Sequence, residues 1–117
     1  MDEGYRSLVS GASWQPYENG KTLSTHGSED GIIIADEDLL GLARITLEKG
    51  ARRIPFAITF GVRGLFVHTT YLGSDEYLPA TLRRLEYALR IVVEKNLSSS
   101  TEQDVQRLVV ELISEFS

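Results

Sequence analysis

The chain has 117 residues, of which 42% are hydrophobic and 25% are charged, and these proportions are typical of one ordinary globular domain. It contains no cysteine, which excludes a disulfide framework, a thiolate metal site and a thiol nucleophile. A formal net charge of −5 argues against a general nucleic-acid or membrane-surface binder, because such proteins present a basic face to phosphates. The first residues lack the basic region and apolar core of a signal peptide, and no apolar run is long enough to span a bilayer, so we expect a cytoplasmic protein.

The first thirty residues predict little regular structure. Residues 1–12 are compatible with one or two helical turns that end at Gly11. Residues 13–31 are mostly polar, and they include Asn19-Gly20, the pair favoured in a two-residue type I′ turn because both central positions need positive φ. We expect a small hairpin around this pair, with an exposed loop as the alternative.

Residues 31–50 predict two strands. The first is the apolar, β-branched run from Gly31 to Ala35, whose length favours a buried strand. The segment 36–50 fits either a helix capped by Asp36 or a strand over residues 42–48, where apolar and polar residues alternate. Gly41 favours the strand, because glycine inside a helix costs about 1 kcal/mol relative to alanine, whereas in a turn it costs little.

Residues 54–72 predict the central hairpin of the sheet, since two runs rich in aromatic and β-branched residues flank a Gly-x-x-Gly break. If Arg63-Gly64 forms a two-residue turn, Val62 pairs with Leu65 and His68 faces Thr59 directly. A longer loop would change these cross-strand partners. In the two-residue register the core face carries Phe56, Ile58, Phe60, Val62, Leu65, Val67, Thr69 and Tyr71. The opposite face carries Ala57, Thr59, Gly61, Phe66, His68, Thr70 and Leu72.

Beyond Gly73 the hydrophobic period changes from two to about 3.6. The pattern predicts a long helix from a cap at Ser74 or Asp75 to about Lys95, with Pro79 tolerated only in its first turn. A second apolar stripe, after the serines at 98–100, predicts a helix that runs almost to the end of the chain.

Strands followed by two helices indicate an α+β fold. We expect a single domain over residues 1–117, with a loop-rich part up to residue 30. Residues 31–72 should form an antiparallel sheet of four or five strands, built as hairpins or a meander. Residues 74–116 should form the two C-terminal helices, packed on one face of that sheet.

No motif in the sequence specifies a chemistry. The Gly61–Gly64 stretch lacks the Gly-Lys-Ser/Thr of a phosphate-binding loop, and the acidic run from Asp36 lacks calcium ligands at its fifth and twelfth positions. His26 and His68 could join nearby carboxylates in a metal site, but a loop fixes no geometry there, and we expect neither a metal nor a cofactor. The candidate ligand-binding residues lie on the second face of the sheet: His68, Thr59 and Thr70, with Arg63 and Arg44 for an anionic group.

The sequence therefore predicts a small protein-interaction or regulatory module without evident catalytic machinery. We expect it to pair with itself as a homodimer or to bind another protein, and we expect no nucleic acid or membrane partner. The alternative is a small-molecule-binding protein or enzyme that uses the sheet face around His68.

Overall fold

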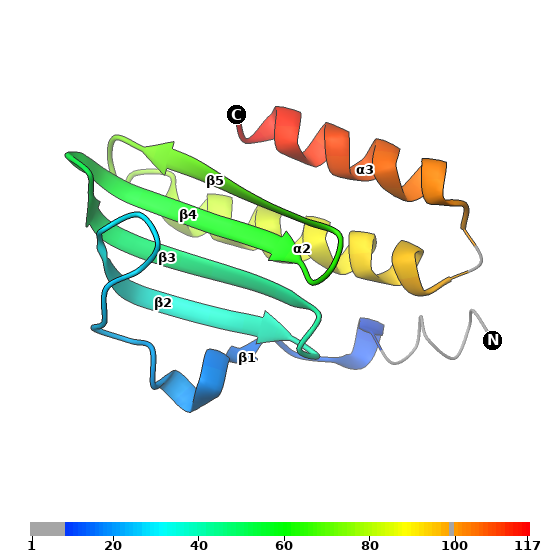
Figure 1. Cartoon of the computed structure of the whole chain (residues 1–117), viewed down its shortest axis with the longest axis horizontal. Coiled ribbons are helices and arrows are strands. Elements are labelled where there is room, and N and C mark those ends of the chain that lie inside the picture. Colours follow the sequence, from blue (N-terminus) through cyan, green and yellow to red (C-terminus); the bar gives the residue numbers. More distant parts are fainter. Residues whose placement is uncertain (1–8, 99) are drawn as a thin grey trace.

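The chain forms a five-stranded antiparallel sheet followed by two C-terminal helices, as seen in a computed structural model that describes residues 9–98 and 100–117 (Figure 1). The strands lie side by side in chain order. They are β1 (Gln15–Pro16), β2 (Ile32–Leu39), β3 (Ala43–Ala51), β4 (Ile54–Val62) and β5 (Phe66–Leu72). The helices are α2 (Leu78–Leu97) and α3 (Glu102–Glu115). The predicted α+β class, the meander and the two helices are confirmed, while the helical turns expected before residue 9 lie outside the described residues.

The ambiguous segment 36–50 is a strand, as Gly41 indicated. Leu40 and Gly41 have positive φ values of 57° and 68°, and they turn the chain from β2 into β3. β3 is the middle strand of the sheet and alternates as predicted, with Ala43, Ile45 and Leu47 buried toward the helices.

The small hairpin predicted at Asn19-Gly20 is wrong. Residues Tyr17–Gly20 form a short 3₁₀ helix, η1, and the chain joins the sheet just before it, through β1, which pairs with the end of β2. Asn19 and Gly20 do have positive φ, 58° and 82°, but here they bend the chain instead of joining two strands. The loop alternative describes residues 21–31, which run as turns and bends apart from an isolated antiparallel bridge between His26 and Ile32.

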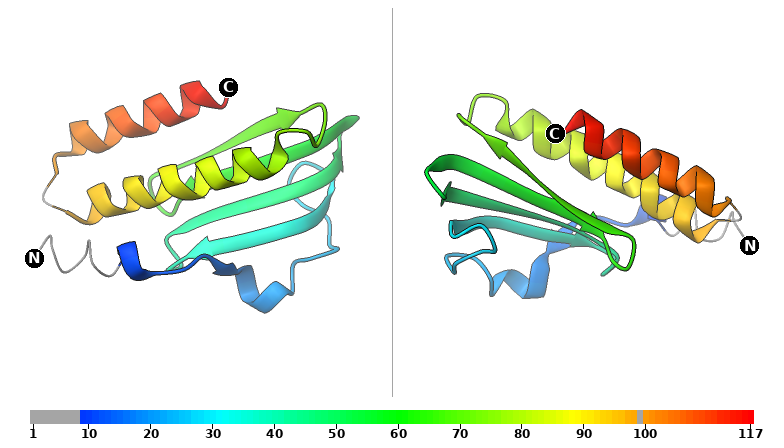
Figure 2. Two further views of the ribbon diagram at one scale, coloured as in Figure 1. Left: turned by 180° about the vertical axis from the view of Figure 1, so that it is seen from behind. Right: turned by 45° about the horizontal axis from the view of Figure 1, so that its top comes forward.

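The core lies between α2 and one face of the sheet. α2 packs across this face, and α3 lies beside α2 (Figure 2). Pro79 lies in the first turn of α2, as predicted, and the cap of α3 is Thr101, whose side chain accepts a hydrogen bond from the Asp104 N–H. Among the described residues, no helix is both long and apolar enough to cross a membrane. The core side chains from the sheet are Leu39, Ala43, Ile45, Leu47, Ile58, Phe60 and Val62, and those from the helices are Leu85, Ala88, Leu89, Val92, Val93, Val109 and Leu112.

The turn between β4 and β5 is one residue longer than predicted. The Leu65 N–H donates to the Val62 carbonyl at 2.9 Å, Gly64 has a φ of 75°, and Val62 pairs with Phe66. This is a three-residue loop with glycine in the left-handed position, another common hairpin connection. Every residue of β5 therefore faces the side opposite to the one predicted. Phe66, His68, Thr70 and Leu72 face the helices, and Val67, Thr69 and Tyr71 face away.

Candidate functional site

The sheet face turned away from the helices, which we call the open face, is partly covered by residues 17–31, the covering segment. In Figure 1 the part of this segment that follows η1 forms a loop in front of β3. Two buried carboxylates from the sheet, those of Asp36 and Glu48, hold it in place.

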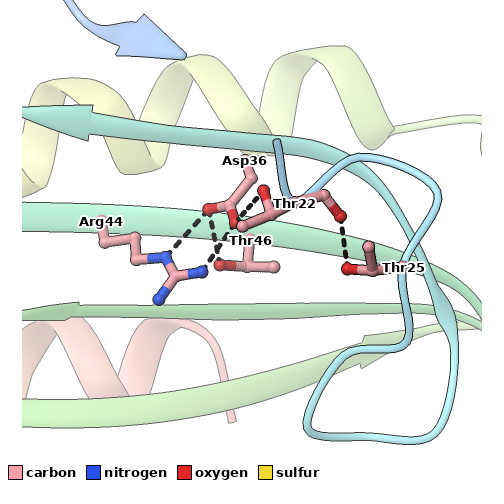
Figure 3. Close-up of polar contacts among 5 residues, drawn as sticks. All are labelled: Thr22, Thr25, Asp36, Arg44 and Thr46. Carbon is pink, nitrogen blue, oxygen red and sulfur yellow. Dashed lines mark hydrogen bonds and ion pairs between the residues drawn. The ribbon is translucent and has the colours of Figure 1, made fainter. Parts of the chain in front are cut away.

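The Asp36 carboxylate on β2 is the first of these anchors, and its donors are drawn in Figure 3. Asp36 is 5% exposed, and Arg44 Nε and Nη2 donate to its two oxygens at 2.9 and 2.7 Å. The hydroxyls of Thr46, its cross-strand partner, and of Thr22 in the covering segment donate at 2.9 and 2.8 Å. Four donors thus compensate the buried charge, and one of them ties the covering segment to the sheet.

Arg44 is held from two sides. The Tyr17 ring lies over its guanidinium, 3.6 Å from the carbon to the ring centroid, while the hydrogen bond to Asp36 raises the pKa of Arg44 above its already high ordinary value. Figure 3 shows the third nitrogen, Nη1, pointing away from Asp36. Within the described residues no hydrogen bond involves Nη1, so this corner of a fixed guanidinium is free to bind another group.

The Glu48 carboxylate on β3 is the second anchor, and the side chain is completely buried. It accepts the backbone N–H groups of Glu29 and Gly31 at 3.1 and 3.0 Å. A β-carbon at Gly27 would lie only 2.3 Å from the carboxyl carbon, so the loop approaches this closely only with glycine there. The Tyr71 hydroxyl on β5 donates to the Glu29 carboxylate, a bond that raises the pKa of Tyr71. The covering segment therefore reaches from β2 and β3 to β5.

A pocket of about 760 Å³ lies between the covering segment and the β4–β5 turn. The side of the pocket formed by the sheet includes Thr46, Thr59 and Gly61. The first residues of β5 line the opposite side. A β-carbon at Gly61 would lie 2.3 Å from the Phe66 carbonyl oxygen. The backbone at the start of β5 therefore approaches β4 so closely here that only glycine fits at position 61. The remaining polar and charged side chains along the pocket are those of Tyr17, Thr22, Thr25, His26, Ser28, Asp38, Arg44 and Arg63.

Three of the five candidate residues from the sequence meet in this pocket, namely Arg44, Thr59 and Arg63. The other two, His68 and Thr70, lie on the helix side because of the longer turn. His68 packs edge-on against the Phe60 ring, with 5.5 Å between ring centres.

The predicted direct pairing of His68 with Thr59 is therefore wrong. The Thr59 hydroxyl oxygen instead lies 3.0 Å from that of Thr69. The buried Nε2 of His68 has no hydrogen-bond partner in the part of the chain that the structure describes.

A metal site that joins His26 and His68 is ruled out, because the two side chains lie on opposite faces of the sheet. No group of three potential metal ligands occurs within residues 9–98 and 100–117. Sequence reasoning overlooked the contribution of the covering segment, whose pocket residues are Tyr17, Thr22, Thr25, His26, Gly27 and Ser28. The only sequence signal was the density of hydroxyl side chains in a segment that otherwise resembled an ordinary loop.

The outer edge of β5 is the second feature of interest. In the described part of the chain β5 pairs with β4 alone, and its ladder runs from Phe66 to Leu72 without a register shift. The strand contains neither a proline nor a Lys, Arg, Asp or Glu residue, and Val67 is 72% exposed. The opposite edge is different, because β1 has two residues and one of them is Pro16.

Comparisons of the chain with protein-family models, with curated proteins and with solved structures gave no match.

Proposed function

We propose that the protein is a small interaction module that pairs with a second copy of itself through the free edge of β5. The observation that carries this proposal is the character of that edge. A long, regular and uncharged edge strand presents a row of unpaired backbone groups, and monomeric proteins usually block such a row with lysine, proline, a bulge or a short strand. β5 has seven residues and contains no lysine, proline or bulge, whereas β1 is short and contains Pro16.

The sequence of β5 suits antiparallel pairing with itself. If a two-fold axis passes at Thr69, then Val67 of one copy lies opposite Tyr71 of the other on the open face. On the helix side His68 lies opposite Thr70, and Phe66 opposite Leu72, so apolar and small polar side chains meet and no like charges do. Cross-strand pairs of an aromatic with a β-branched residue contribute about 0.2–1 kcal/mol each, in addition to the backbone hydrogen bonds. An interface of this kind is the same patch on both copies, as a two-fold dimer requires.

Thr69→Lys tests the proposal, because it would place two ammonium groups opposite each other at the axis. A matched control is Val110→Lys, which introduces the same side chain at an exposed apolar position on α3 (Val110 is 60% exposed). The measurement is the mass in solution by light scattering and sedimentation, from low to high micromolar concentration. The chain mass is 13.0 kDa, so a dimer has twice this mass.

We expect the wild type and Val110→Lys to be dimers and Thr69→Lys to be a monomer with an unchanged circular dichroism spectrum. A wild-type monomer at high micromolar concentration would overturn the proposal, and so would a Thr69→Lys dimer, since that dimer would use another surface. Where Thr69→Lys lowers stability, Val67→Lys is the second variant, because it places an ammonium group opposite Tyr71 of the other copy and lies at a more exposed position.

A further inference from the structure

Basic side chains gather at the open-face pocket although the whole chain has a net charge of −5. Arg44 and Arg63 line the pocket beside His26 and one acid, Asp38, while the carboxylate of Asp36 lies 2.7 Å from Arg44 Nη2. The Asp38 carboxylate already accepts the Gly41 N–H at 3.1 Å, within the turn between β2 and β3. Because Asp36 already balances the charge of Arg44, an anionic ligand would be bound by the N–H groups of Arg44 that have no partner among the described residues, together with the charge of Arg63.

Arg44 is built as a fixed anion-binding group. Asp36 holds Nε and Nη2, and Tyr17 covers one face of the guanidinium, so little side-chain freedom remains to be lost on binding. The edge formed by Nη1 and the second hydrogen of Nη2 is free of hydrogen bonds to the described residues. A planar fork of this kind matches the two oxygens of a carboxylate or a phosphate.

The rest of the pocket suits an apolar body with a polar end. Its volume of about 760 Å³ is within the range of small-molecule sites, about 300–1,000 Å³. The side chains of Leu42 and Val67 line it beside the hydroxyls of Thr25 and Thr59. Exposed Arg63 at the β4–β5 turn supplies a second positive charge at the rim.

We propose that this pocket binds a small organic oxyanion, a carboxylate or a phosphate on a mainly apolar body, with Arg44 binding the charged group. The groups proposed to bind the anion, Arg44 and the covering segment, belong to one chain, although Val67 belongs both to the pocket and to the β5 edge. Anion binding is therefore tested in the wild type, and because pairing is measured by mass and binding by chemical shift, the failure of one proposal is distinguishable from the failure of the other.

The experiment is a titration of ¹⁵N-labelled protein with benzoate, with phenyl phosphate and with neutral benzyl alcohol, followed by the backbone amide signals and the Nε signal of Arg44. We expect saturable shifts of Arg44, Gly61 and Thr25 with one or both anions, and none with benzyl alcohol. Comparison of the two anions distinguishes a carboxylate site from a phosphate site. Equal binding of benzyl alcohol, or no saturable shift with either anion, would overturn the proposal.

The substitution Arg44→Lys keeps a positive charge beside Asp36 but removes the fork. We expect at least a tenfold loss of affinity for the anion. Arg84→Lys is the matched control, because Arg84 forms a similar two-nitrogen pair with Glu115, at 2.8 Å for both bonds, between the two helices. Unchanged affinity in Arg44→Lys, or an equal loss in Arg84→Lys, would contradict the assignment. If Arg44→Lys fails to fold, Arg63→Gln provides the second test, with an expected loss of several-fold.

Discussion

Replacement of Glu48 by glutamine should weaken the attachment of the covering segment. The Oε1 atom of Glu48 accepts the N–H groups of Gly31 and Glu29 at 3.0 and 3.1 Å, and Oε2 lies 3.4 Å from the Glu29 nitrogen. The glutamine carbonyl can keep both bonds to Oε1, but without the charge. Its NH₂ group then occupies the place of Oε2 and faces an N–H donor.

The expected magnitude follows from the strength of these bonds. A hydrogen bond to a charged group contributes about 1.5–3 kcal/mol and a neutral one about 0.5–1.5 kcal/mol. Because both bonds lose their charged acceptor, Glu48→Gln should lower the free energy of unfolding by about 2 kcal/mol. Glu48→Ala should cost about 4 kcal/mol, because it leaves two N–H groups without an acceptor and removes buried atoms. The control is Glu111→Gln on the exposed side of α3, which should stay within about 0.5 kcal/mol of the wild type.

The measurement is urea unfolding of the three variants, combined with hydrogen exchange of the backbone amides of residues 24–31. We expect faster exchange in this segment at urea concentrations where α2 is still protected. The reasoning is refuted if Glu48→Gln unfolds with the wild-type free energy, or if the exchange of Glu29 and Gly31 is unchanged.

Two further predictions concern Glu37 and Gly61. Burial, and then the hydrogen bond and charge of Glu86, raise the pKa of Glu37 from 4.5 to about 7. The folded state therefore holds this proton more tightly than the unfolded state, and stability should fall by about 2 kcal/mol as the pH rises from 4.5 to 7, after allowance for solvent screening. Glu37→Gln should abolish this fall in urea unfolding at several pH values, and a wild type of constant stability over the window would contradict it. Gly61→Ala should lower the free energy of unfolding by about 1–3 kcal/mol, because the added β-carbon would meet the Phe66 carbonyl oxygen. Gly73→Ala is the control, because no atom lies near its β-carbon, and it should leave the stability unchanged. Equal effects of the two substitutions in thermal unfolding would refute the close approach.

The order of strands and helices was predictable because each element has a clear hydrophobic period. The alternation of β3 and the left-handed turn at Gly41 belong to short stretches of sequence, and local patterns determine them. The hairpin register was not determined in this way. A two-residue turn and a three-residue loop both accept a glycine with positive φ at position 64, so the letters Val62-Arg63-Gly64-Leu65 fit either. One added residue moved His68 to the helix side.

The pocket was only partly predictable, because half of its polar and charged side chains come from a segment without periodicity. Arg44 and Thr59 were identified from strand alternation, which places them on one face. Thr22 and Glu29 reach this face through contacts with residues 14 and 19 positions away in the sequence, Asp36 and Glu48. Nothing in a loop's composition indicates which strand it will cover. Strand alternation placed Glu48 on the polar side, where a glutamate normally meets water, and the covering segment is the reason that it is buried.

The contrast between the two sheet edges would limit the proposed pairing to two copies. Pairing at β5 would join two five-stranded sheets and leave β1 at both outer ends. β1 offers two residues, and its Pro16 has no N–H to donate, so a third copy would find almost no ladder to extend. Assembly by strand pairing should therefore stop at two copies. A higher protein concentration should increase the fraction of dimer and should not produce fibres.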